Sequence, residues 1–401
     1  NAPTKHGMKN VDITFWVLWL FGFIQFFNFM KIIEVNSPKT KKYFLDVAKL
    51  IYKTDQHWVC PLDKDIEAIF DPKKNNFHSH GKAIRWVLFD DNNQLIGRIA
   101  AFYNEKKAFT FEQPTGGVGF LECIDDADAF KLLFDTAKEW LKLQGMKAME
   151  GPINFGENDT FWGLLIEGFT HPSYGMNYNK SYYHKHFKDY GFVTEYEQLT
   201  NHLDLRIPFP ERFTKIANWV RQKPGYSFEY LEPKKIDKYA NDFIEIYNDG
   251  WKDFNHFVPI KLETIKESFE QMKQIMDPKL IWFAYVNNEP ASFVVILPDA
   301  NQMIKPLNGK LDLIGKLKFL YKRWKGVDRM RAVVMGTKQK FQKHGLESAI
   351  FIILKEYVIP KNQYRELELS WVGDFNDKML AIHDATGSVP AKKHATLIHV
   401  F

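Results

Sequence analysis

A short basic loop between two apolar segments is the part of this 401-residue chain best suited to chemistry. Arg331–Met335 is typical of a buried strand, and the apolar run Leu346–Val358 predicts a buried helix. The first turn of a helix presents unpaired backbone N–H groups and the positive end of the helix dipole. The junction between the two segments therefore predicts an anion site. Further positive charge comes from Lys338, Lys340, Lys343 and His344.

Other common catalytic patterns are missing from the sequence. It contains neither the GxxxxGK[ST] phosphate loop nor the GxGxxG dinucleotide turn, and no GxSxG signature. Its two cysteines, Cys60 and Cys123, exclude a disulfide framework and predict a reducing, cytoplasmic location. His78 and His80 lie in a loop without a third ligand nearby in the sequence, so we expect a surface loop and no metal site.

The basic loop resembles the Q/R-x-x-G-x-G/A signature of the GNAT acyltransferase superfamily. The matching stretch runs from Gln342 to Glu347, with Gly345 at the central glycine and Glu347 where relatives have Gly or Ala. In the family this signature holds the pyrophosphate of acetyl-CoA. The resemblance implies acetyl-CoA, or a longer acyl-CoA, as co-substrate. It implies that the acyl-CoA contacts are Val334, Met335, Gln342, Lys343, His344, Gly345, Leu346, Glu347 and Asn376.

The sequence after the loop resembles the same family. Glu366–Val372 looks like the fifth strand, and Asn376–Met379 with Gly387 looks like the fourth helix and the turn after it. In many relatives a tyrosine four residues before that glycine protonates the leaving thiolate. This chain has His383 there. The resemblance therefore implies that His383, or another group, supplies the proton.

Attack of an amine on a thioester also needs a group that takes a proton from the ammonium. Glu366 and Glu368 share one face of their predicted strand, and Glu157 could reach across from the other half of the chain. Each of them is a candidate base. The alternative for each is a solvated or ion-paired carboxylate without a catalytic role.

The order of elements repeats along the chain, which predicts an α/β fold of two GNAT-like domains packed as a pseudo-dimer. We expect the boundaries 1–29 for a hydrophobic extension, 30–205 for a degenerate GNAT-like domain and 206–401 for the domain with the acyl-CoA loop. The whole chain resembles tandem-GNAT proteins. Asp125, Asp126 and Asp128 stand where the first half would need its loop; they would repel a pyrophosphate and suit helix capping instead.

A loop of mixed character follows a strand in the first half, within residues 150–163. Glycine, proline, amide and aromatic residues in such a position often line ligand sites, and well-capped structural turns are the alternative. For an amine acceptor we expect contacts from Asn154, Glu157, Asn158 and Trp162.

Two hydrophobic segments raise the question of membranes. Ile13–Met30 carries no charge, and we expect it to be an extension foreign to the folded body; a membrane anchor is the alternative. Lys305–Arg329 is basic, with apolar residues at helical spacing. We expect it to pack against its own domain; contact with anionic lipid or a lipid-linked acceptor is the alternative.

Composition is consistent with these expectations. Hydrophobic residues make up 45% of the chain, and 54 Lys+Arg against 49 Asp+Glu give a net charge of +5, below that of a dedicated nucleic-acid binder. We expect a monomeric acyl-CoA-dependent N-acyltransferase, most simply an N-acetyltransferase, that acts on a small amine and binds no nucleic acid. The alternatives are a GNAT scaffold without activity, a membrane-surface acyltransferase, and an aminoacyl transferase that uses charged tRNA.

Overall fold

The computed structural model describes residues 30–401 except 157, 159 and 254–258. The expectation for Ile13–Met30 therefore falls outside the described residues. Within them, no helix combines the length and the apolar character that crossing a bilayer requires.

The first half contains strands and helices close to those expected from the sequence. Its strands are β1 (Lys31–Glu34), β2 (Gly81–Phe89), β3 (Leu95–Asn104), β4 (Thr115–Cys123), β5 (Ala148–Gly151), β6 (Leu164–Glu167) and β7 (Val193–Asp204). Its helices are α2 (Pro38–Ile51), α3 (Asp63–Ile69), α4 (Glu105–Ala108), α5 (Ala127–Leu143) and α6 (Tyr183–Tyr190).

The second half repeats this order after a connecting helix. Its strands are β8 (Tyr226–Tyr230), β9 (Ile281–Val286), β10 (Glu289–Pro298), β11 (Arg329–Thr337), β12 (Glu366–Gly373) and β13 (Val389–Val400). Its helices are α7 (Glu211–Arg221), α8 (Ile236–Trp251), α9 (Leu262–Met272), α10 (Asn301–Ile304), α11 (Leu313–Lys325), α12 (Leu346–Val358) and α13 (Asp377–Ala385).

Local sequence explains where many of these elements begin and end. Ser37 caps α2 with a reciprocal bond to Thr40, and Pro38 fills the first helical position. Asn287 and Asn288 both adopt positive φ in the two-residue turn between β9 and β10, a conformation that asparagine tolerates. The apolar run of α12 buries most of its side chains, as expected.

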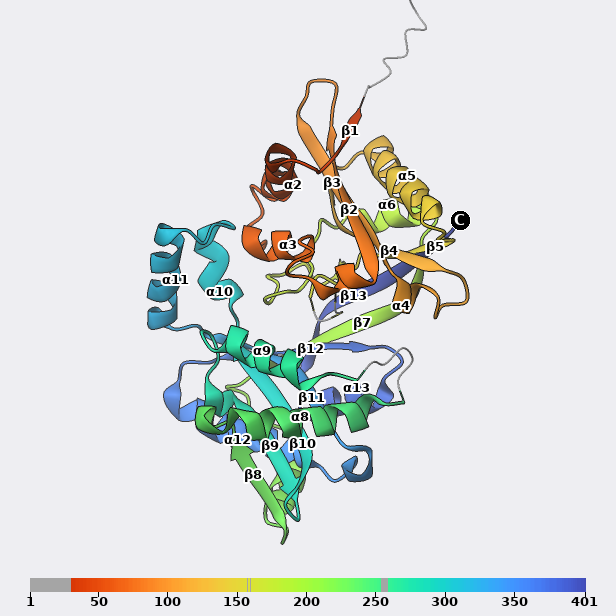
Figure 1. The fold of residues 1–401 in the computed structure, drawn as a ribbon. Coiled ribbons are helices and arrows are strands. Elements are labelled where there is room, and N and C mark those ends of the chain that lie inside the picture. The colour runs from red at the N-terminus through yellow and green to blue at the C-terminus, as the bar shows by residue number, and fades with distance from the viewer. Residues whose placement is uncertain (1–29, 157, 159, 254–258) are drawn as a thin grey trace, which may run out of the picture.

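The described strands form one 13-stranded mixed sheet flanked by helices (Figure 1). Along the sheet the order is β1-β2-β3-β4-β5-β13-β7-β12-β11-β10-β9-β8, with β6 paired to β13. The last strands of the two halves are thus exchanged: β13 pairs with β5, and β7 pairs with β12.

Strand exchange mixes the hydrophobic cores as well. Ala395 and Leu397 of β13 lie in the core that α5 forms on the first half of the sheet. Leu203 of β7 lies in the core that α12 and α7 form on the second half. Each half therefore depends on the other for part of its buried apolar surface.

The helix α11 differs from the sequence expectation. Its apolar side chains were expected to pack against the domain, and that expectation is wrong for the side chains that are exposed. These are Leu313, Ile314, Leu317, Leu320, Tyr321 and Trp324. The spacing predicted the helix correctly, but an amphipathic pattern does not specify which side of a helix meets the protein.

We predict that Leu397→Ala in β13 destabilises the protein by about 2–5 kcal/mol, because it leaves a cavity in the core of the first half. Val400→Ala on the same strand is the matched control, since Val400 is exposed, and should cost within about 0.5 kcal/mol. Urea unfolding followed by tryptophan fluorescence measures both. Equal unfolding midpoints for the two variants would contradict a core built on the exchanged strand.

Candidate functional site

β11 and β12 separate at the point where the candidate site begins. They pair in parallel from Arg329↔Glu366 to Ala332↔Leu369, and no pairing between them continues in the described residues. A bulge against β10 leaves Val333 without a partner in β10. Val334 and Met335 follow it on the length of β11 that is not paired with β12.

The loop that follows β11 ends at the uncapped N-terminus of α12. Gly345 is the N-cap residue with φ +74°, and among the described residues no side chain caps this helix. A Cβ on Gly345 would lie 3.1 Å from Val220 and 3.3 Å from Ile216, both on α7. Conformation and space both favour glycine there. The N–H groups of the first turn consequently remain available to an anion.

Not all the positive charge of this loop is available to a ligand. Lys338 pairs with Glu245 and Glu289, and Lys340 lies 2.7 Å from Glu289. The side chain of Lys343 is exposed, and no carboxylate among the described residues forms an ion pair with it. Lys343 is therefore the lysine of this loop best placed to meet an anion.

Polar side chains around the loop are fixed by neighbouring elements. His344 shares a 2.9 Å hydrogen bond with Tyr226, and Lys378 of α13 donates to Gln342 at 3.2 Å. Asn376 caps α13 by accepting from the N–H of Met379. These contacts hold α13 and β8 against the loop.

Glu347 is the residue that departs from the GNAT signature. Its carboxylate accepts a hydrogen bond from the hydroxyl of Thr337 at the end of β11. Leu346 beside it is fully buried. The negative charge is thereby held at the end of β11.

His383 of α13 is buried to 1% exposure, yet neither ring nitrogen has a hydrogen-bond partner among the described residues. Burial lowers its pKa to about 4. The ring is therefore neutral at pH 7, with one N–H and one lone pair to offer. Unpartnered buried nitrogens of this kind are rare and indicate a group that a ligand satisfies.

The two glutamates of β12 have different environments. Glu368 is buried 2.5 Å from the ammonium of Lys392 on β13. Burial alone would raise the pKa of Glu368, but Lys392 and Arg331 hold it below its ordinary value. Glu366 is half-buried, with His202 at 3.2 Å and His171 at 3.6 Å. Glu368 is thus a paired anion directly before the strands separate.

In the first half the corresponding helix N-terminus is closed. Asp126 caps α5 by accepting from the N–H of Ala129 at 2.8 Å, as the sequence predicted. Asp125 contacts His186 at 2.7 Å. An anion would meet these carboxylates rather than free N–H groups.

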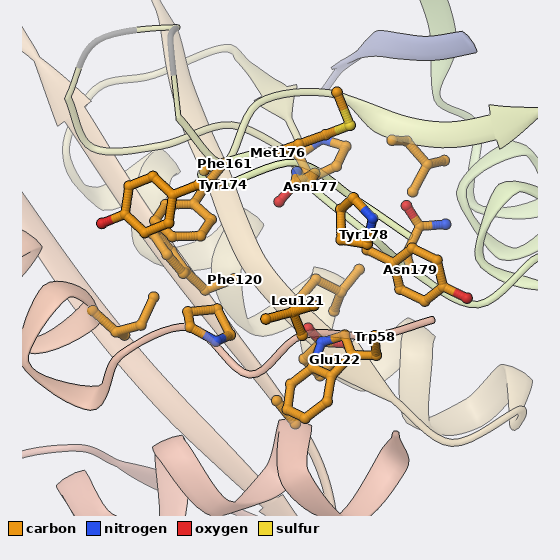
Figure 2. Close-up of a pocket in the computed structure, with 18 of the residues that line it drawn as sticks. Trp58, Phe120, Leu121, Glu122, Phe161, Tyr174, Met176, Asn177, Tyr178 and Asn179 are labelled. Atoms are coloured by element: carbon orange, nitrogen blue, oxygen red, sulfur yellow. The ribbon is translucent and has the colours of Figure 1, made fainter. Parts of the chain in front are cut away.

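A pocket of the first half lies where β4 and β5 separate. Trp58 and Glu122 lie at one end of it, and Phe161 and Tyr174 at the other (Figure 2). The β4 bulge places Phe120 at positive φ in its wall. The pocket combines aromatic walls with one buried carboxyl group, a combination that suits a cation with an apolar body.

Glu122 is the polar centre of this pocket. Its carboxylate accepts from the hydroxyls of Tyr52 at 2.6 Å and Tyr183 at 2.9 Å, and Arg98 lies 3.5 Å away. Burial raises the pKa of Glu122 against the opposing effect of Arg98. We did not predict this residue from the sequence. The available signal was an acidic residue inside the otherwise apolar strand Val118–Cys123.

The side chains expected to recognise an acceptor lie apart from this pocket. The indole N–H of Trp162 donates to Tyr196 and Thr396, and Asn154 donates to Thr160. Asn158 is exposed, and Glu157 falls outside the described residues. The same loop contributes Pro152, Phe161 and Leu164 to the pocket wall instead.

Comparisons with known proteins give full-length relatives. No protein-family model matches the chain. A bacterial ceramide synthase from Caulobacter vibrioides is 28% identical over 376 residues, which cover 91% of this chain and 96% of that protein. Protein YghO from Escherichia coli K12 is 28% identical over 359 residues, covering 88% of this chain and 91% of that protein.

Solved structures show the same architecture. A tandem GNAT protein from the clavulanic acid biosynthesis pathway aligns with a TM-score of 0.56 at 13% identity, over 92% of this chain and 98% of that one. A GCN5-related N-acetyltransferase from Sphaerobacter thermophilus aligns with a TM-score of 0.50 at 8% identity, over 92% and 95%. Together with the repeated elements and the exchanged last strands, these likenesses identify the fold of this chain as a tandem GNAT fold.

Proposed function

We propose that this protein is an N-acyltransferase that moves an acyl group from acyl-CoA to an amine. The observation that carries the proposal is the uncapped N-terminus of α12 at Gly345, placed directly beside the separated ends of β11 and β12. The first half lacks such a terminus because Asp126 caps α5. We therefore assign the acyl-CoA site to the second half.

The residues present fit acyl-CoA. The N–H groups that follow Gly345 and the ammonium of Lys343 would hold the pyrophosphate. The length of β11 that β12 leaves unpaired, with Val334 and Met335, would lie along the rest of the molecule. Bound acyl-CoA supplies the activated thioester. Glu347 is compatible with this arrangement because Thr337 holds its carboxylate.

Neutral His383 is our candidate for the group near the thiol. Its buried nitrogens have no partner among the described residues, and a ligand atom would satisfy one of them. A neutral imidazole can donate a hydrogen bond to a leaving thiolate without carrying a positive charge into a dry site. Glu368 and Glu366 remain candidates for receiving the proton of the amine. Because Lys392 lowers the pKa of Glu368, Glu366 is the more basic choice by environment.

We infer that the acceptor is a long-chain amine. The pocket around Glu122 offers a carboxylate for an ammonium and aromatic walls for an apolar chain. One relative is named a ceramide synthase, and a ceramide is the amide of a fatty acid with a long-chain amino alcohol. The name of that relative and the chemistry of the pocket both support a long-chain amino alcohol as acceptor and a long-chain acyl group as donor.

We predict that the full-length protein binds palmitoyl-CoA in a calorimetric titration and that Gly345→Asp abolishes binding, because it adds a side chain and a negative charge at the helix terminus. Lys343→Glu tests the same site without strain, since Lys343 is exposed, and should weaken binding about tenfold. Lys53→Glu reverses an exposed charge elsewhere and should bind normally. Undiminished binding by Lys343→Glu would remove the pyrophosphate from this loop.

We predict that the protein joins palmitoyl-CoA and sphinganine into an amide, with one free CoA thiol released per amide. Mass spectrometry of the lipid product and a thiol assay measure the two in parallel. Leu121→Trp, which narrows the pocket beside Glu122, should raise the KM for the long-chain amine more than the KM for acyl-CoA. Acyl-CoA binding without amide formation for any amine tested would reduce the protein to a binding scaffold.

We predict that His383→Gln lowers kcat by a factor that does not change between pH 5.5 and 8. The reason is that burial holds the pKa of His383 at about 4, so the ring stays neutral over this range. The measurement is the ratio of the two kcat values across the range. A ratio with an inflection near pH 6.5 would show that the ring titrates as an ordinary histidine and would contradict the neutral role.

A further inference from the structure

One face of α11 is apolar and has no partner in the described residues. Leu313 is 75% exposed and Trp324 is 83% exposed, and the other apolar side chains of this face are 55–64% exposed. They are Ile314, Leu317, Leu320 and Tyr321. Figure 1 shows α10 and α11 at one side of the molecule, apart from the helices that cover the sheet. Side chains this apolar at this exposure mark a surface that binds something.

The opposite face of the same helix holds it to the protein. Gly315 is buried, and a Cβ there would lie 2.4 Å from the carbonyl oxygen of Lys310 and 3.2 Å from Leu307. Phe319, four residues later, packs against two hydrophobic clusters of the second half. With about 100° between successive helical residues, the exposed apolar side chains occupy an arc of about 120° that points directly away from Gly315 and Phe319.

Positive charges border this arc on both sides. Helical geometry places Lys316 and Arg323 along one border and Lys318 and Lys325 along the other. Asp312, the acidic residue nearest in sequence, accepts from the N–H of Gly315 as the N-cap. The basic character continues into the adjoining cleft, whose wall includes Lys305, Lys322 and Arg365.

Charge selects one occupant for this face. A second copy of the chain would bring two sets of lysines together, and like charges would oppose the contact. The segment Ile13–Met30 carries no charge and would leave the flanking cations unpaired. An anionic bilayer offers acyl chains to the apolar arc and phosphates to its borders at the same time.

We propose that α11 lies in the plane of an anionic bilayer surface. Leu313, Leu317 and Leu320 enter the boundary of the acyl chains, and the lysines reach back to the phosphates. Tyr321 and Trp324 sit at the level of the headgroups, where aromatic side chains with a polar atom are favoured. This contact is independent of the acyl transfer proposed above, because vesicle binding requires neither acyl-CoA nor an amine.

The test is flotation of the full-length protein with vesicles of phosphatidylcholine, with and without about 30% phosphatidylglycerol. We expect binding to the anionic vesicles and at least tenfold weaker binding to the neutral ones. Trp324→Glu on α11 should lose at least tenfold in binding. Trp219→Glu is the matched control, because Trp219 is also exposed, at 63%, on helix α7, and it should float like the parent protein.

Charge reversal at the border gives an independent variant, since Lys318 and Lys325 are exposed and make no ion pair among the described residues. Lys318→Glu with Lys325→Glu should weaken binding at least about 25-fold, from about fivefold for each lysine near an anionic surface. Binding that both α11 variants retain would overturn the proposal and move the contact to another part of the chain. Self-association that Trp324→Glu abolishes, without vesicle binding by the parent, would overturn it in favour of a second copy.

Discussion

The exchange of last strands between the two halves is the constraint on which the rest of the structure depends. β13 completes the sheet beside β5, and β7 completes it beside β12. A strand buried between two neighbours must satisfy its backbone groups on both edges, so neither half can close its sheet alone. The exchange also brings Lys392 of β13 to Glu368 of β12, so the buried ion pair beside the candidate site depends on it.

The two halves show how one fold can keep and lose an anion site. The corresponding helices α5 and α12 both follow a bulged strand. At α5 the carboxylate of Asp126 occupies the helix N-terminus, and at α12 Gly345 leaves it open. A single side chain therefore decides whether the first turn binds its own carboxylate or an external one, because the same N–H groups serve both. This difference supports acyl-CoA in the second half and an acceptor pocket in the first.

A buried polar network joins the pocket of the first half to the strands of the second. Arg331 donates to the carbonyl oxygen of Tyr174 at 2.6 Å, and Asp299 accepts from the N–H of the same residue at 3.0 Å. Asp299 in turn pairs with Arg329 at the start of β11. Charges so deeply buried persist only when they are paired and hydrogen-bonded, which fixes the loop that carries Tyr174 in one position. Any movement of this loop would be felt at both sites.

The sequence by itself determined the elements, the repeat and the basic loop, because hydrophobic periodicity, caps and glycine act over a few residues. The helix Leu346–Val358 and the cap at Asp126 were predicted from those signals alone. Only the tertiary structure decided which strands exchange, that Glu122 faces a pocket, that His383 is buried without a partner, and that the apolar face of α11 points outward. The physical reason is that burial and strand pairing depend on segments far apart in the chain, and a local pattern fixes the face of an element without fixing what that face meets.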